Sequence, residues 1–247
     1  MASHRLYTDL SQWFALLTPP EDYVEEAGHL RRAIRNKLGP GRHKLLDLGV
    51  GGGHHLSHLV GEFEATGVDL SPDMLARCRE VIPDIPLHTG DMRSVRLGEV
   101  FDVVQIHDAV TYLLSEDDIR ATLETARAHL RPGGVLVMAP DDFRETYRDG
   151  QIDDTQRRFP GGEFTCFMYD FDPDPDDTTA DPLFFYVIRR GAEIEVHQEQ
   201  HTFGLFSQAT WLELMRETGF AAEVVPYAVE SHDGPLSLLV GTLEAPQ

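Results

Sequence analysis

Apolar and polar positions alternate in two different ways along residues 43 to 140. Short apolar runs, which predict buried strands, are separated by segments with apolar residues at helical spacing. Ser71 and Ser115 stand at the starts of two of those segments and are good N-cap residues. Strands that alternate with helices indicate a parallel sheet with right-handed crossovers. The predicted strands are residues 44–48, 64–69, 86–89, 101–106 and 135–138.

The segments on either side of this region follow other patterns. Residues 1–38 carry two apolar stripes at helical spacing, separated by Thr18-Pro19-Pro20, and predict a helical cap. After residue 140 the pattern changes to β segments at 163–170, 183–189 and 193–203. We predict that these segments form an antiparallel β flap inserted after the fifth strand, above the carboxyl ends of the parallel strands.

The last part of the chain returns to helix and strand. Ser207 caps a helical segment that Gly219 ends, and two strands at 223–227 and 236–241 follow. The sequence therefore predicts one α/β domain, doubly wound, with a mostly parallel seven-stranded sheet. Its parts are the helical cap (1–40), the core (41–140), the flap (141–206) and the closing helix and strands (207–247).

Composition and charge narrow the class of protein. The 247 residues are 41% hydrophobic, and no apolar run approaches the roughly 18 residues that predict a membrane span. The first residues lack the apolar stretch of a signal peptide. A formal charge of −21 argues against a nucleic-acid partner, because phosphate binding needs a basic face. Cys78 and Cys166 stand far apart, which favours the reducing cytoplasm, and both a monomer and a homodimer stay open.

The stretch HKLLDLGVGGGHH, residues 43–55, is the best candidate for a ligand site. Glycines after a strand allow positive φ and bring backbone N–H groups close to a ligand. A nicotinamide fingerprint needs a glycine where His54 stands, and a Walker loop needs a GK[ST] ending that the sequence lacks. The pattern that remains is GxGxG, formed by Gly49, Gly51 and Gly53.

Three carboxylates accompany the glycines. Asp69, at the tip of the second strand, lies where nucleotide-binding folds place a ribose-binding carboxylate. Asp91, at the tip of the third strand, suits an adenine amino group. Asp47 lies within the apolar first strand, where burial requires a partner such as glycine-loop N–H groups or a ligand ammonium.

With these residues in place, the sequence resembles the class I S-adenosylmethionine-dependent methyltransferases. The matching segments, LLDLGVGGG, VDLSPDM, TGDM, FDVVQIHDAVTYL and LRPGGVLV, follow that family's order over residues 44–140. LYTDLSQWF and LFSQATWLELMRETGF resemble small-molecule N-methyltransferases that act on amino sugars and related natural products. Where those relatives often carry a Tyr-Asp pair, this chain has Phe14-Ala15. The resemblance implies a Rossmann-like fold that binds S-adenosylmethionine and releases S-adenosylhomocysteine.

The resemblance also implies roles for individual residues. The three glycines would hold the methionine part of the cofactor, Asp69 the ribose and Asp91 the adenine amine. Met74 and Met92 would flank the adenine, since methionine is unbranched and polarisable. The rest of the expected cofactor-binding set is Asp47, Leu70, Gly90 and His107.

Methyl transfer from a sulfonium is an in-line displacement, so the protein mainly aligns the reactants, excludes water and removes a proton where needed. His107 and Asp108 follow the fourth strand, and His107 is the better candidate base, with an unperturbed pKa of about 6.5. Tyr7 is a third catalytic candidate, because its ring could cover the sulfonium. The expected substrate-binding residues are Trp13, Tyr112, Phe143 and Tyr169.

Several functions stay open at this point. The expected reaction is methyl transfer to a small-molecule amine; a hydroxyl or carboxyl acceptor, and a non-catalytic S-adenosylmethionine-binding protein, are the alternatives. A nicotinamide oxidoreductase is disfavoured by His54. No metal is expected at His54 and His58, nor at the acidic loop 172–177, which lacks the EF-hand glycine and glutamate.

Glutamate and histidine residues alternate near the end of the predicted flap. Glu195, His197, Glu199 and His201 fall on one side of a predicted strand. We expect them on a solvated strand face; the alternative is that they face the substrate.

Overall fold

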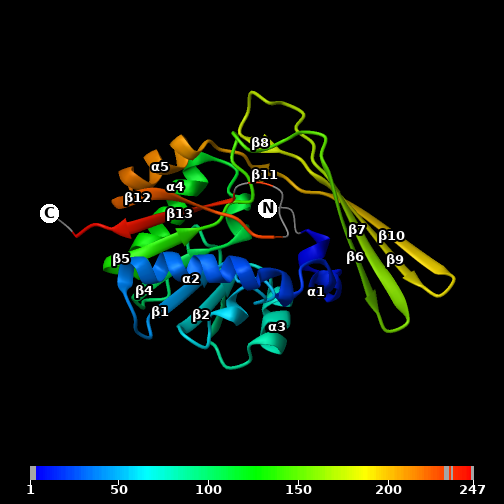
Figure 1. Ribbon diagram of the computed structural model, residues 1–247, viewed down its shortest axis with the longest axis horizontal. Helices are drawn as coiled ribbons and strands as arrows, with labels where there is room; N and C mark the ends of the chain where they lie inside the picture. Colours follow the sequence, from blue (N-terminus) through cyan, green and yellow to red (C-terminus); the bar gives the residue numbers. More distant parts are fainter. Residues whose placement is uncertain (1–3, 231–233, 235, 246–247) are drawn as a thin grey trace.

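Seven strands form the central sheet, in the spatial order β12-β13-β5-β4-β1-β2-β3 (Figure 1). The computed structural model describes residues 4–230, 234 and 236–245. The first five strands pair in parallel, whereas β13 is antiparallel to β5 and to β12. The strands are β1 (Lys44–Leu48), β2 (Glu64–Asp69), β3 (Leu87–Thr89), β4 (Phe101–Ile106), β5 (Leu130–Met138), β12 (Phe220–Tyr227) and β13 (Leu236–Leu243).

Helices cover both faces of this sheet. α2 (Val24–Leu38) and α3 (Pro72–Val81) pack in one core cluster, and α4 (Glu116–His129) and α5 (Gln208–Glu217) pack in another. α3, α4 and α5 each begin after a serine whose side chain accepts a backbone N–H, as the sequence predicts. The expected doubly wound, mostly parallel seven-stranded sheet is therefore confirmed.

The strand order reverses at β1, which lies between β2 and β4. In open α/β sheets, ligands bind at the carboxyl ends of the strands beside such a reversal. The glycines after β1, Asp69 at the end of β2 and His107 after β4 consequently lie at one edge of the sheet.

Two predicted helices are wrong. After the glycines the chain forms only the 3₁₀ turn Leu56–His58, because Gly49, Gly51 and Gly53 have positive φ and hold the backbone in a loop. The first cap helix is likewise broken into short turns, and α2 is the long helix of the cap. The first predicted helix is replaced by the 3₁₀ turns Arg5–Tyr7 and Ser11–Trp13 and the short α1 (Phe14–Leu17), and a further 3₁₀ turn, Pro20–Tyr23, precedes α2.

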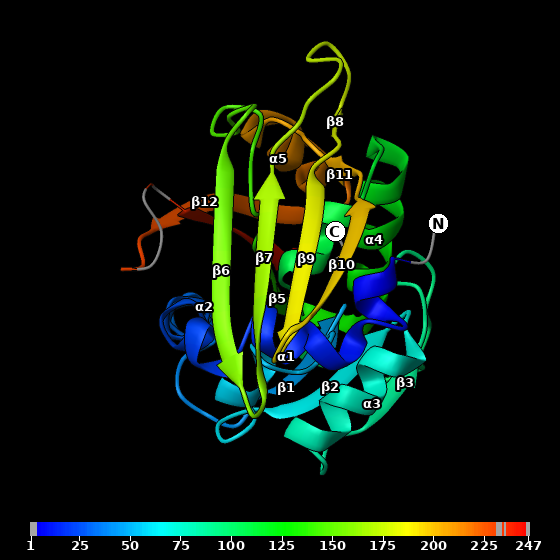
Figure 2. The ribbon, with the colours of Figure 1, turned by 90° about the vertical axis from the view of Figure 1, so that its right-hand side faces the viewer.

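The flap is a separate antiparallel sheet with the strand order β10-β9-β7-β6 (Figure 2). The sequence pattern does not predict β6, because its residues IDDTQRRF are mostly polar and exposed. The expected third β segment ends early, at Gln200, because Phe203–Gly204 (β11) pairs instead with Thr179–Ala180 (β8). The flap strands are β6 (Ile152–Phe159), β7 (Gly162–Tyr169), β9 (Leu183–Arg190) and β10 (Glu193–Gln200).

The N-terminal segment lies between the core and the flap, as both views of the ribbon show (Figures 1 and 2). Leu6, Leu10 and Trp13 form one buried cluster with flap residues that include Phe164 and Tyr186. The side chains of this segment therefore reach the flap on one side and the carboxyl edge of the sheet on the other.

Some predicted segments extend beyond the part of the chain that the structure describes. Residues 1–3 of the cap, and residues 231–233, 235, 246 and 247 of the closing part, lie outside it. Within the described ranges, no helix has the length and apolarity needed to cross a membrane.

Candidate active site

The glycine loop after β1 has the backbone geometry that the sequence predicts. Gly49, Gly51 and Gly53 have φ values of 88°, 54° and 77°, which L side chains rarely adopt. A Cβ on Gly49 would lie 2.2 Å from the Cβ of Ala109, in the turn that follows β4. The loop therefore requires glycine both for its φ angles and for its close contact with that turn.

Asp69 joins this loop to the N-terminal segment. Its carboxylate accepts N–H bonds from Gly51 and Ser71, both at 2.8 Å. The hydroxyl of Ser71 donates in turn to the backbone oxygen of Tyr7 at 2.5 Å. Burial raises the pKa of Asp69, and the backbone N–H bonds oppose that rise. The side chain of Leu70, directly after Asp69, is 53% exposed and leaves an apolar surface beside the carboxylate.

Asp47 is held differently from the prediction. Its Oδ2 accepts an N–H from the Gln105 amide at 2.7 Å, and its Oδ1 has no hydrogen-bond partner among the described residues. Burial raises the pKa of Asp47 to about 7. The N–H groups of the three glycines bond elsewhere, so a glycine-loop partner is wrong. Gln105, the polar residue of β4 that pairs with Asp47 in register, could have been found from the sequence.

The residues expected around an adenine differ in their burial and in their contacts. Asp91 binds the guanidinium of Arg93 through both carboxylate oxygens, and Arg93 also pairs with Asp118 at 2.6 Å. These contacts lower the pKa of Asp91. Met74 is 1% exposed and lies under Gly51, whereas Met92 is partly buried. Gly90 allows Val95 to pack closely, since an added Cβ would meet it at 2.8 Å.

His107 lies between two carboxylates. Its Nδ1 is 2.5 Å from Asp108 and its Nε2 is 2.8 Å from Glu26 of α2. The ring stacks on His55 with centroids 4.1 Å apart. Burial alone lowers the pKa of His107, but Asp108 and Glu26 outweigh it and raise the pKa well above its usual value. With both nitrogens facing carboxylates, His107 has no free lone pair, and this geometry does not favour the expected base.

Asp108 is the partner that stays accessible. Its side chain is 48% exposed, and its Oδ2 accepts the hydroxyl of Tyr23 at 3.0 Å. Burial would raise the pKa of Asp108, but His107 and Tyr23 outweigh it and lower the pKa, so the carboxylate stays ionised. Asp141 is an exposed residue whose carboxylate accepts the Thr111 hydroxyl at 3.2 Å, and desolvation by the neighbouring groups and the charge of Asp108 raise its pKa. The site thus holds the ionised carboxylate of Asp108 beside the carboxyl of Asp141, whose pKa is raised.

Tyr7 and Tyr112 join the N-terminal segment to the turn after β4. Their hydroxyl oxygens are 2.8 Å apart, and the Tyr112 oxygen is also 2.7 Å from Nδ1 of His201. His201 is 1% exposed, and its Nε2 lies 3.1 Å from Glu199. The expectation of a solvated strand face is therefore wrong for His201 and Glu199, because the N-terminal segment covers them.

Three predicted substrate-binding residues lie elsewhere. Trp13 packs between Phe159 and Phe164 of the flap, with centroids 5.2 and 6.1 Å away. Phe143 is 3% exposed in the core cluster of α4 and α5. Tyr169 lies at the exposed end of β7. The structure brings together Tyr7, Asp108, Tyr112 and the glycine loop, but not these three aromatic residues.

The candidate metal positions have other roles. His54 Nδ1 lies 2.6 Å from the Thr18 oxygen and His58 Nε2 lies 2.7 Å from the Pro20 oxygen, so both hold the cap against the glycine loop. In the acidic loop, side chains such as Asp172 and Asp174 accept N–H groups of the loop itself. Two triads group possible ligand atoms within 4.8 Å: His4 with Glu199 and His201, and Glu26 with His107 and Asp108.

Neither triad has the arrangement of a metal centre. Glu26 and Asp108 face opposite nitrogens of the His107 ring, so one ion could not meet all three in these positions. The rings of His4 and His201 are stacked, with centroids 3.9 Å apart, whereas two histidines that share an ion direct their nitrogens edge-on.

The site has the features that an S-adenosyl group needs. The glycine turn with positive φ leaves room for a ligand close to the backbone, and Asp69 lies at the strand tip with an exposed Leu70 beside it. The ionised Asp108 supplies a negative charge for a cationic group. The residues present therefore fit S-adenosylmethionine.

Comparisons with known proteins agree with this site. A methyltransferase-domain family matches residues 45–134. The dTDP-3-amino-3,4,6-trideoxy-α-D-glucopyranose N,N-dimethyltransferase of Streptomyces venezuelae is 33% identical over 205 residues, 82% of this chain and 85% of that protein. The dTDP-3-amino-3,6-dideoxy-α-D-glucopyranose N,N-dimethyltransferase of Streptomyces fradiae is 31% identical over 208 residues, 83% of this chain and 80% of that protein. CalS10, an amino pentose methyltransferase from Micromonospora echinaspora solved with S-adenosylmethionine bound, matches with a TM-score of 0.79, 25% identity and coverage of 98% of both chains.

The fold, the glycine loop and these matches define a class I S-adenosylmethionine-dependent methyltransferase, so the protein is an enzyme with S-adenosylmethionine as its cofactor. More narrowly, the chain belongs to the family of the amino-sugar N-methyltransferases. The resemblance seen in the sequence is thereby confirmed.

Proposed function

We propose that the protein transfers methyl groups from S-adenosylmethionine to the amino group of a nucleotide-linked amino sugar, twice in succession. Membership of the family supports an amine acceptor, and the two relatives compared above are named for dTDP-linked 3-amino sugars. This chain has Phe14-Ala15 in place of the common Tyr-Asp pair, and Tyr7 and Tyr112 supply a pair of hydrogen-bonded hydroxyls besides the Tyr23 hydroxyl that binds Asp108.

The observation that carries this proposal is the fixed charge of Asp108. His107 and Tyr23 hold its carboxylate in place and keep it ionised, while the side chain stays accessible. An amino sugar arrives at neutral pH as an ammonium, and a carboxylate in this position attracts and orients it. The same charge stabilises the positive charge as it passes from sulfur to nitrogen.

The other residues take roles that follow from their positions. S-adenosylmethionine would supply an electrophilic methyl group, and Gly49, Gly51, Gly53 and Asp69 would hold it. Tyr7 orients the acceptor nitrogen through its hydroxyl. The N-terminal segment, held by Ser71 on one side and by the flap on the other, excludes water from the reacting groups.

The surroundings of His107 favour an amine over a hydroxyl acceptor. A hydroxyl must lose its proton to a base as it attacks, and His107 is occupied by Glu26 and Asp108. An amine needs only to lose the proton of its ammonium form. We further propose a cytoplasmic enzyme, because Cys78 and Cys166 are both buried free thiols, without a nucleic-acid partner and acting as a monomer or homodimer.

The test is a set of matched acceptors. The protein with S-adenosylmethionine is given dTDP-3-amino-3,6-dideoxy-α-D-glucopyranose, its 4-amino isomer and the sugar with a hydroxyl in place of the amine. Mass spectrometry should show two methyl groups added to one of the amino sugars and none to the hydroxyl analogue. Methylation of the hydroxyl analogue, or of no amino sugar, would overturn the proposal.

A further inference from the structure

A continuous chain of polar side chains leads away from the acidic group into the interface between cap and flap. It runs from the Tyr7 hydroxyl to the Tyr112 hydroxyl at 2.8 Å, then to Nδ1 of His201 at 2.7 Å. Nε2 of His201 lies 3.1 Å from the carboxylate of Glu199, on β10. Three parts of the fold, the N-terminal segment, the turn after β4 and the flap, each contribute to this chain.

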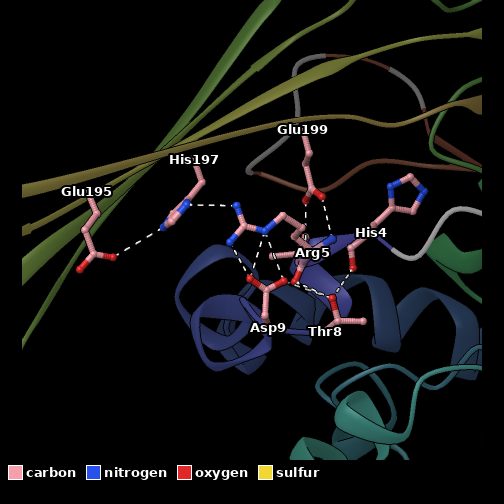
Figure 3. Close-up of polar contacts among 8 residues, drawn as sticks. His4, Arg5, Thr8, Asp9, Glu195, His197 and Glu199 are labelled. Atoms are coloured by element: carbon pink, nitrogen blue, oxygen red, sulfur yellow. Dashed lines mark hydrogen bonds and ion pairs between the residues drawn. The ribbon is translucent and has the colours of Figure 1, made fainter.

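The Glu199 end of the chain is fixed and ionised. Its carboxylate accepts the backbone N–H groups of Arg5 at 2.8 Å and Leu6 at 3.2 Å, and the hydroxyl of Tyr186 at 2.8 Å. Figure 3 shows the carboxylate of Glu199 directed at the N-terminal segment, with His4 beside it. Burial alone raises the pKa of Glu199, but His201 and Tyr186 outweigh it and lower the pKa to about 2.

An ionised carboxylate only accepts hydrogen bonds, and that sets the direction of the whole chain. Nε2 of His201 has no hydrogen bond among the described residues, but an ionised carboxylate 3.1 Å away favours a hydrogen on this nitrogen, which leaves Nδ1 as the acceptor for the Tyr112 hydroxyl. The Tyr112 oxygen then accepts from the Tyr7 hydroxyl. Every donor points towards Glu199, so the lone pairs of the Tyr7 oxygen face the site.

The two phenols do not act as the base themselves. Burial raises the pKa of Tyr7 and that of Tyr112 above the usual value of tyrosine. Both hydroxyls therefore keep one proton each at neutral pH and can only pass a proton on. The imidazole of His201 is the group in the chain with a free nitrogen to receive it.

We propose that Glu199 and His201 are positioning residues that act through Tyr112, and that the four side chains form a proton relay for the acceptor amine. This inference rests on the proposed function. As the ammonium gives its proton to the Tyr7 oxygen, Tyr7 passes its own to Tyr112, and Tyr112 passes its own to Nδ1 of His201. One N–H bond of the ammonium breaks and one Nδ1–H bond forms. The nitrogen lone pair is free to attack the methyl group, and the charge rests on His201 beside Glu199.

The groups that face His201 are compatible with this role. The ring of His4 stacks on it at 3.9 Å, and burial lowers the pKa of His4, which stays neutral. Arg5 directs its guanidinium to Asp9 and to His197 (Figure 3). Glu199 is consequently the charge that compensates an imidazolium at His201.

The first test reads the tautomer of His201 without any acceptor. In protein labelled with ¹⁵N-histidine, the imidazole signals that vanish in the His201→Asn variant are assigned to His201. At pH 8 they should show a protonated Nε2 and a bare Nδ1. A protonated Nδ1, or an imidazolium at that pH, would overturn the relay, whatever the enzyme methylates.

The second test compares single-turnover methyl transfer between pH 7 and pH 9.5 in wild type, His201→Asn and Glu199→Gln. At pH 7 the His201→Asn rate should fall by about 10²-fold, because the amine then arrives protonated. The deficit should shrink as pH rises and the amine arrives neutral, with the acceptor KM nearly unchanged. The control is His197→Asn, which changes a histidine of β10 that is bonded to Arg5. This variant should keep the wild-type pH profile. A deficit that is equal at every pH would mean a purely structural role and overturn the proposal.

The Tyr112→Phe variant distinguishes loss of the relay from misfolding, because it removes only the oxygen that links Tyr7 to His201. In this background, His201→Asn should cost little more in rate, because the relay is already broken. Full additivity of the two losses would overturn the proposal. An inactive wild type would refute the proposed acceptor, whereas the tautomer would still decide the relay.

Discussion

Two of the buried histidines near the site, His107 and His201, differ in what surrounds them. Both are nearly inaccessible, at 7% and 1% exposure, and both lie next to a carboxylate. His107 has a carboxylate at each nitrogen, whereas His201 has a carboxylate at one and a tyrosine hydroxyl at the other. Two carboxylates hold a proton on an imidazole, and one carboxylate with one hydroxyl leaves a nitrogen free. Residue type and burial therefore do not define a base; the second partner does.

This contrast also separates the tasks of the two histidines. His107 lies 2.5 Å from Asp108, and under the proposed function it contributes charge and geometry rather than proton transfer. His201 lies one residue further from the site, behind Tyr112. Each prediction that follows changes one side of this comparison.

The largest effect is expected for Asp108→Asn, which keeps the shape of the side chain and removes its charge. The rate of methyl transfer should fall by about 10²- to 10³-fold, because the positive charge at the acceptor nitrogen loses its counter-charge. Steady-state kinetics with the amino sugar measures the loss. Asp117→Asn, an exposed carboxylate at the start of α4, serves as the control. A change of less than threefold in the Asp108 variant would remove this residue from the site.

A smaller effect is expected for stability in His107→Gln. The raised pKa of His107 means that its ion pairs stabilise the fold fully below pH 6.5, and that this stability is lost as pH rises through the folded-state pKa. Wild type should exceed the variant by about 3 kcal/mol at pH 6, with a difference that narrows towards pH 10. Denaturant unfolding at a series of pH values checks this. A constant difference would show that His107 is neutral and that the two histidines are alike.

The smallest effect is expected for Asp69→Ala, which leaves both histidine groups intact. Affinity for S-adenosylhomocysteine should weaken about 10-fold, a loss of about 1.4 kcal/mol, through lost ribose contacts and a loosened glycine loop. Calorimetric titration measures this loss of affinity. The Asp91→Ala variant is titrated for comparison, because the Asp91 carboxylate is already bonded to Arg93. Equal affinity of the Asp69 variant and wild type would show that the carboxylate only shapes the loop.

Most of the core fold could be predicted from the sequence because its signals are local. Apolar runs set the strands, Ser71, Ser115 and Ser207 begin their helices, and the glycines fall at the reversal of strand order. β6 could not be predicted, because a polar strand at the edge of a flap carries no alternating pattern.

The partners within the site were beyond the sequence for a related reason. Glu26 lies on α2 and meets His107 only when the helix packs over the sheet. The period-two pattern correctly places Glu199 and His201 on one side of a strand, but no pattern shows that the N-terminal segment covers that side. Side-chain chemistry could be predicted where a strand ends, and could not where two distant segments meet.

The contact between Gly49 and Ala109 has a consequence for adapting the enzyme to other acceptors. Because the glycine loop and the turn after β4 touch at these two positions, that turn cannot be lengthened or shifted without displacing the loop. Useful diversity for a mutant library lies in side chains that leave this backbone in place, at Thr111 and Tyr112, and in the strands of the flap. Directed evolution of acceptor range should accordingly recover side-chain exchanges there and reject insertions next to Ala109.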